Sequence, residues 1–215
     1  DLPGNFHVVR QYLGYLKYGY SDRVSVAQQM ATIADNLYIN LNLIRVGESF
    51  TDAQRRALDL AVQITRDVYR AVGVGIGRVS HYFIPDNEAG GFTEIGSNDE
   101  ARDLTNSFSQ DNDGLDAFMV PLWPGTQIGW SEIRGSCCKD CWGIIPRGSG
   151  LVVEVKPDYR TGLTLAHEIG HYLGLNHVDD DDNLMYKEVT LGRTALTEGQ
   201  GDWIRTHCSM RFPCG

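Results

Sequence analysis

Hydrophobic and polar residues alternate along the chain in a pattern that predicts strands separated by helices. Strands are predicted where short apolar or alternating runs end at turn residues, at 38–46, 76–84, 115–121 and 150–156. Helices are predicted where apolar residues recur at helical spacing, at 26–37, 51–73, about 97–108, 161–174 and from 197 onward. A chain of 215 residues with 42% hydrophobic content can form one domain or two tightly joined lobes.

Two helix starts are marked by a pair of residues that can satisfy the free backbone N–H groups of a first turn. Thr51 is followed three residues later by Gln54, and Thr197 is followed three residues later by Gln200. In this capping pattern each side chain bonds the backbone N–H of the other residue. We therefore expect helices to begin immediately after Thr51 and Thr197.

The segment 167–177 reads HEIGHYLGLNH and carries the strongest chemical signal in the chain. His167 and His171 are four positions apart, so a helix places both on one face. Gly174 lets the helix stop and the backbone turn back, which brings His177 toward the same face. A catalytic zinc typically has three protein ligands, such as neutral imidazoles, and a fourth position open to water or substrate. The three histidines are therefore predicted to bind Zn2+.

This segment and Met185, which lies eight residues after His177, resemble the metzincins. That clan of zinc endopeptidases is recognised by HExxHxxGxxH and a downstream Met-turn. The resemblance implies that Glu168 is the general base and that Met185 is a hydrophobic floor beneath the zinc ligands. It also implies that Tyr186 lies near the wall of the substrate pocket.

The order of the predicted elements also resembles the metzincin plan. The resemblance implies an α+β fold, with a twisted mixed sheet and long helices in an upper lobe and a small lower lobe after the third histidine. We expect a single catalytic domain over 1–215, with the upper lobe at about 1–176 and the lower at about 177–215. The motif spacing is closest to the matrixins, but Val178 and Lys187 differ from the usual matrixin residues, so the subfamily stays unassigned.

The resemblance implies hydrolysis of a protein or peptide substrate by water activated on zinc. Glu168 would take the proton of this water and pass it to the leaving amine. Two alternatives are a zincin that hydrolyses a non-peptide amide and an idle zincin domain that only binds peptides. Residues 126–133 or, in competition with them, 142–147 would form the sheet edge along which metzincins bind a peptide as an added strand.

Composition limits the possible binding partners and the cellular location of the protein. The net charge is −9 with a pI near 5.0, and the absence of a basic patch argues against nucleic acid. The chain contains no run of 18 or more apolar residues, so no membrane span is predicted. The N-terminal residues lack the features of a signal peptide, which a secreted enzyme would already have lost. We expect a secreted protein and favour a monomer.

Five cysteines fall in two clusters, at Cys137, Cys138, Cys141, Cys208 and Cys214. Three interpretations are open: disulfides, reduced structural thiols, or a second zinc site that uses the CxxC spacing of Cys138 and Cys141. Disulfides are favoured and would imply an oxidising compartment, with one thiol left over. Because a lower lobe of about 39 residues has little core, we expect at least one disulfide that involves Cys208 or Cys214.

Two acidic segments, 179–182 and 111–116, raise the question of calcium. Neither has the regularly spaced oxygens and the distal carboxylate of a full calcium-binding loop. Solvated turns are the favoured interpretation of both segments, and Ca2+ binding is the alternative.

Overall fold

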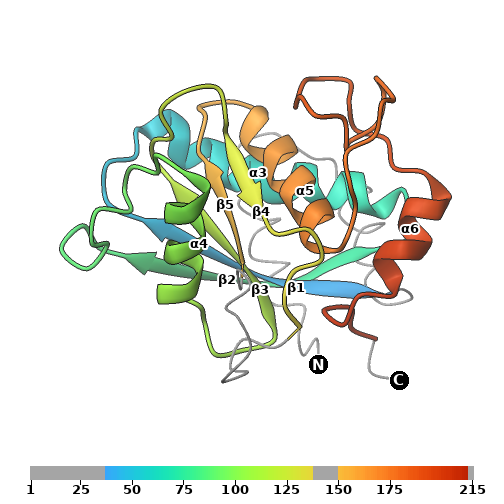
Figure 1. Cartoon of the computed structure of the whole chain (residues 1–215), viewed down its shortest axis with the longest axis horizontal. Helices are drawn as coiled ribbons and strands as arrows, with labels where there is room; N and C mark the ends of the chain where they lie inside the picture. The colour runs from blue at the N-terminus through green and yellow to red at the C-terminus, as the bar shows by residue number, and fades with distance from the viewer. Residues whose placement is uncertain (1–36, 138–149, 213–215) are drawn as a thin grey trace.

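The computed structural model describes residues 37–137 and 150–212, and within them five strands form one mixed sheet (Figure 1). The strands are β1 (Tyr38–Val46), β2 (Gly75–Ile84), β3 (Gly114–Val120), β4 (Gly129–Ser131) and β5 (Gly150–Glu154). Their order is β2-β1-β3-β5-β4, and all neighbours are parallel except β4, which is antiparallel to β5. The helix predicted at 26–37 lies outside the described residues.

Helices cover both faces of this mixed sheet, and the predicted α+β fold is confirmed. The helices are α3 (Asp52–Arg70), α4 (Asn98–Ser107), α5 (Arg160–Tyr172) and α6 (Glu198–Arg205). One core lies between the sheet and α3 with α5, and a second core lies between the opposite face and α4. None of the helices in the described part of the chain is long and apolar enough to cross a membrane.

The polar positions of β1 lie inside the protein. Asn40 and Asn42 are only 7% and 0% exposed. Asn42 Nδ2 donates to Asn112 Oδ1 at 2.7 Å and to Asp116 Oδ1 at 2.6 Å. Asn40 Nδ2 donates to Asp113 Oδ2 at 2.8 Å. Since an unpaired buried amide would cost about 1–3 kcal/mol, these bonds fasten the start of β3 to β1.

Both capping patterns form as predicted. Gln54 N–H donates to Thr51 Oγ1 at 3.2 Å, and Thr51 N–H donates to Gln54 Oε1 at 2.9 Å. Gln200 N–H and Thr197 N–H make the equivalent bonds at 3.2 Å and 2.8 Å. The helices α3 and α6 therefore begin at the residue after each threonine. Each cap stabilises its helix by about 1 kcal/mol.

The helices α3 and α5 pack closely against each other. Tyr69 of α3 is fully buried, and its hydroxyl donates to Ala166 O of α5 at 2.8 Å. A Cβ built on Gly162 of α5 would lie only 3.0 Å from Ala61 Cα of α3, so a larger residue would push the helices apart. This close contact fixes α5, which carries the predicted zinc ligands.

Several element bounds differ from the sequence prediction by one to three residues. The largest difference is in α3, which ends at Arg70 rather than 73. The helix α5 ends at Tyr172 rather than 174, because Gly174 turns the backbone into positive φ. The strands β3 and β5 end at Val120 and Glu154 rather than 121 and 156. The short edge strand β4 falls within 126–133, whereas the competing segment 142–147 lies outside the described residues.

Candidate metal centre

The helix α5 carries the first two histidines of the predicted zinc site in its last turns. Leu165, Ala166 and Ile169 pack into the core on the side of the sheet that α3 also covers. His167 and His171 lie one turn apart and are 3% and 7% exposed. Their rings meet edge to face with centroids 4.6 Å apart. A well-packed helix thus presents both imidazoles on one face.

A glycine turn brings the third histidine back to this face. Gly174 has a φ of +100°, a conformation that glycine adopts at little cost. After the turn, His177 Nε2 lies 3.2 Å from His167 Nε2 and 3.0 Å from His171 Nε2. Two nitrogen ligands of a tetrahedral zinc, each about 2.1 Å from the metal, are about 3.4 Å apart. The three nitrogen atoms therefore fit a shared zinc ion.

Backbone carbonyls orient two of the rings. His167 Nδ1–H donates to Leu184 O at 2.7 Å, and His171 Nδ1–H donates to Leu175 O at 2.8 Å. These bonds leave the lone pair of each Nε2 directed toward the shared point. Burial lowers the pKa of His167 and His171 to about 4, and it also lowers the pKa of His177. At neutral pH the rings are therefore in the uncharged form that binds zinc.

Glu168 lies beside the first ligand with its carboxylate buried. Burial raises the pKa of this carboxyl to about 8, and a divalent cation nearby would favour the charged form. Gly129 of the edge strand β4 lies directly against it, since a Cβ built there would be 2.6 Å from Glu168 Oε1. Gly129 falls within the predicted sheet edge at 126–133, but its contact with Glu168 was not predictable, because no local pattern reports a contact between β4 and α5.

Met185 lies beneath α5 and is fully buried. A Cβ built on Gly170 would be 2.5 Å from Met185 Sδ, so the small residue between the two helical histidines makes room for the sulfur. Met185 N–H donates to Asn183 Oδ1 at 2.9 Å, and Met185 O accepts from Val178 N–H at 3.0 Å. The Met185 turn is thereby tied to the residue that follows the third histidine.

Tyr186 is half-buried in the loop that follows. The guanidinium carbon of Arg193 lies 3.9 Å from the centre of the Tyr186 ring. Arg193 also pairs with Asp181 at 3.1 Å and donates to Glu188 O at 3.0 Å. The loop is therefore folded around the guanidinium group of Arg193. The place of Tyr186 in a substrate pocket stays a prediction.

Some side chains of the two acidic segments accept from protein donors. Asp113 pairs with Arg78 and accepts from an amide of β1, and Asp116 Oδ2 accepts from Ser109 Oγ at 2.9 Å. In the second segment, Asp180 Oδ1 accepts from the Asp182 N–H at 3.2 Å. The Asp180 contact is that of a turn, the Asp113 contacts join distant segments, and calcium binding stays an alternative.

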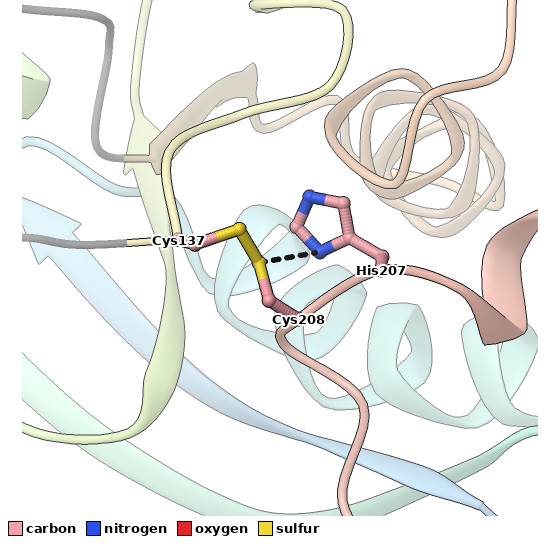
Figure 2. Close-up of side chains that lie close together, drawn as sticks. All are labelled: Cys137, His207 and Cys208. Carbon is pink, nitrogen blue, oxygen red and sulfur yellow. Dashed lines mark hydrogen bonds between the residues drawn. A yellow bond between two sulfur atoms is a disulfide. The ribbon is translucent and has the colours of Figure 1, made fainter.

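One disulfide joins Cys137, which follows β4, to Cys208, which follows α6 (Figure 2). The two Cα atoms are 5.7 Å apart and 71 positions apart in sequence. This bond confirms the expectation of at least one disulfide that involves Cys208 or Cys214. The alternative of a second zinc site at Cys138 and Cys141 falls on residues outside the described part of the chain.

Residues 134–137, here called the strap, run along the end of α5, a contact that the sequence analysis missed. Arg134 N–H donates to His171 O at 2.9 Å, and Gly135 N–H donates to Tyr172 O at 2.8 Å. The last carbonyls of a helix have no partner within the helix itself. The strap supplies two of these partners, one of them on a predicted zinc ligand.

The fold and this site together define a class of protein. A mixed sheet, a helix with two histidines, a glycine turn and a third histidine form the arrangement of a metzincin-like zincin. A family model described as Matrixin matches residues 49–202. The chain belongs to the matrixin family, which assigns the subfamily that the motif left open.

Solved structures share this fold. Metalloproteinase-II from Bacteroides fragilis superposes with a TM-score of 0.51 at 18% identity, over 77% of this chain and 52% of that chain. Archaemetzincin from Methanopyrus kandleri superposes with a TM-score of 0.50 at 17% identity, over 78% of this chain and 95% of that chain. The chain thus spans about half the length of the Bacteroides protein. No curated protein matches it by sequence.

Proposed function

We propose that this protein is a zinc-dependent endopeptidase whose metal is bound by His167, His171 and His177. The observation that carries the proposal is the meeting of three imidazoles, with His177 Nε2 only 3.2 Å and 3.0 Å from the other two Nε2 atoms. Three neutral nitrogen donors leave the ion much of its charge and one open position. Membership of the matrixin family supports the same ligand set.

Glu168 is proposed as the general base. When bound, zinc supplies a Lewis acid that lowers the pKa of water to about 7 and stabilises the developing oxyanion. The Glu168 carboxylate orients the attacking water, accepts its proton and delivers a proton to the leaving amine. The C–O bond to the attacking water forms first, and the amide C–N bond breaks once the leaving amine has received its proton, so no covalent intermediate with the protein is needed.

We further propose that the whole chain is one catalytic domain, with an upper lobe at about 1–176 and a lower lobe at about 177–215. The cleft between the lobes would hold the substrate. Met185 would form the floor beneath the imidazoles, which is supported by its contact with Gly170 of α5. Tyr186 would form part of the wall of the substrate pocket.

The substrate is proposed to be a protein or peptide that lies as an added strand along β4. Among the described residues β4 is an outer strand of the sheet, and its Gly129 lies against Glu168. Trp130 is buried and anchors β4 to the core, whereas Ile133 just after it is 50% exposed. Added strands are held largely by backbone hydrogen bonds, which suits an enzyme that accepts varied sequences.

The proposed location is outside the cell, with the protein acting as a monomer. The disulfide between Cys137 and Cys208 supports this location, because such bonds persist in oxidising compartments. An amide hydrolase and an idle peptide-binding domain are the competing functions.

Digestion of denatured casein separates these functions. The zinc-loaded protein should cleave casein, lose activity with a chelator and regain it with added Zn2+. His177→Ala should lose most of its zinc affinity, whereas His81→Ala, at an exposed position of β2, should retain it. Undiminished zinc affinity in His177→Ala would refute the ligand set. Binding of casein without cleavage, or hydrolysis of small amides alone, would refute the endopeptidase assignment.

A further inference from the structure

A second group of metal-binding side chains lies next to the end of α5. It consists of Cys137 of the strap together with His207 and Cys208, which follow α6 (Figure 2). Their candidate ligand atoms all lie within 4.8 Å of one another. His207 is 4% exposed, whereas both cysteines are exposed. Solvent species can therefore reach the sulfur atoms while the imidazole is held inside the protein.

The His207 ring is oriented as a metal ligand would be. Nε2–H donates to Gly135 O at 3.3 Å, and Nδ1 accepts from Ser209 N–H at 3.2 Å. The lone pair of the ring is therefore on Nδ1, which lies 3.8 Å from Cys208 Sγ, and a cation bound there would take the place of the Ser209 N–H. Metal-binding histidines usually donate their other ring N–H to a carbonyl or carboxylate in this manner. Burial also lowers the pKa of His207, which keeps the ring neutral.

We propose that Cys137, His207 and Cys208 form a binding site for a thiophilic divalent cation such as Zn2+ when their disulfide is reduced. A phosphine or dithiol reductant supplies two electrons, and two protons are taken up as the S–S bond breaks into two thiols. Each thiol then releases its proton as the sulfur binds the cation. The two thiolates neutralise the cation, the imidazole is the third ligand, and water takes the fourth position.

The backbone already has the spacing that this site needs. Two thiolate ligands of a tetrahedral zinc, each about 2.3 Å from the metal, are about 3.8 Å apart. With Cα atoms 5.7 Å apart, the Cys137 and Cys208 sulfurs can reach that separation by side-chain rotation alone. Exposed disulfides are also the more readily reduced ones. The strap can thus be crosslinked to the chain after α6 in two ways. In the oxidised protein the crosslink is the disulfide, and in the reduced protein it is the metal bound by both thiolates.

Cobalt(II) is the probe for this site, because thiolate ligands give it a near-ultraviolet charge-transfer band that nitrogen ligands do not. The full chain carrying His167→Ala is reduced with a phosphine, desalted without oxygen and titrated with Co2+. This background removes the three-histidine site, so the result is independent of the proposed endopeptidase. We expect a thiolate band that saturates near one Co2+ per chain in the reduced protein and is absent from the oxidised protein.

Variants locate the ligands. In the same background Cys208→Ser should abolish the band, and His207→Gln should weaken Co2+ binding at least about tenfold. Cys141→Ser is the matched control and should leave the band unchanged. A band that survives Cys208→Ser but is lost in Cys141→Ser would overturn the proposal in favour of the CxxC pair. Loss of the native far-ultraviolet circular dichroism on reduction, before cobalt is added, would overturn it too.

Discussion

The chain before Gly174 and the chain after it build one metal centre by different means. The first region places His167 and His171 on a buried helix that packs on α3 and the sheet. In the second region, over residues 175–212, α6 is the one regular helix, and the rest consists of turns, bends, isolated bridges and irregular chain. Packing therefore fixes the first two ligands, whereas the Gly174 turn and individual hydrogen bonds, such as Val178 N–H to Met185 O, fix the third.

The two regions also differ in how the loss of a single contact affects their stability. Helix and sheet positions in the first region are held by many small contacts, so the loss of one contact is shared among its neighbours. In the second region single bonds carry more of the structure, such as Leu184 N–H to Ala195 O at 2.7 Å and Ala195 N–H to Asp182 O at 3.1 Å. We expect chemistry to be most sensitive to changes in the first region and stability of the site to changes in the second.

The largest effect is expected from Glu168→Ala in the first region. Zinc binding and folding should persist, while the rate of peptide cleavage falls by at least about 10²–10⁴-fold because the general base is lost. Steady-state kinetics with metal analysis of the same sample measures both. Glu88→Ala, at an exposed position, is the control and should change neither. A near wild-type rate in Glu168→Ala would place the base elsewhere.

The second prediction tests the region after Gly174. Removing the disulfide with the double variant Cys137→Ser/Cys208→Ser should lower the free energy of unfolding by about 2–4 kcal/mol, as measured in urea. Hydrogen exchange should rise more within 175–212 than within β1. The exposed Thr190→Ala serves as the control. Equal loss of protection in both regions would show that the two regions open as one unit.

A smaller effect is expected where the edge strand meets the helix. In Gly129→Ala the new methyl group would lie 2.6 Å from Glu168 Oε1 and must displace it. Because catalysis depends on the placement of the base, the rate should fall between about 10- and 100-fold with zinc retained. Gly199→Ala is the matched control, since a Cβ there meets nothing within 4 Å. An unchanged rate in Gly129→Ala would mean that the Glu168 carboxylate has freedom to move.

The smallest effect concerns the pH dependence of stability in the metal-free chain. The folded pKa of about 4 for His167 and His171 lies below the ordinary 6.5, so the unfolded chain binds more protons between these values. Their contribution to stability is therefore lost as pH falls from 6.5 toward 4. Glu168 acts in the opposite sense, because its folded pKa of about 8 lies above 4.5 and stability declines as pH rises between these values.

Below pH 6.5 the two histidines change the free energy of unfolding with pH more than Glu168 does. Above pH 6.5 only Glu168 changes it. The free energy of unfolding of the chelated protein, and with it the melting temperature, should therefore peak near pH 6.5. The free energy should change by about 1.4 kcal/mol per pH unit on either side of the peak. Calorimetry between pH 5 and 8 tests this. Bound zinc should flatten the decline above the peak, since it favours ionised Glu168. A melting temperature that keeps rising to pH 8 would contradict the buried state of this carboxyl.

Local patterns were sufficient to predict most of the regular elements. The strand expected at 38–46 is β1 at those residues, and α3 starts directly after Thr51 as its cap indicates. The convergence of the histidines was also predictable, because helical periodicity and the Gly174 turn both act within eleven residues. Alternation alone could not reveal that Asn42 is buried, since its partners lie in a loop and strand far along the chain.

Contacts between distant segments were not predictable. The strap on α5, the approach of Gly129 to Glu168 and the stacking of Arg193 on Tyr186 depend on how the fold brings segments together. Five cysteines likewise leave pairing undetermined, because any pairing is compatible with the spacing alone. Residues that support a site from other elements therefore emerge only once the fold is known.

The Gly174 turn also has a consequence for the rate at which metal exchanges. Two ligands stand ready on a folded helix, whereas the third depends on the backbone conformation of a single glycine. We expect metal capture to begin at the helical pair and to finish when the turn closes over it. Release would follow the reverse order, so the lifetime of the loaded enzyme would be set by how often that turn opens.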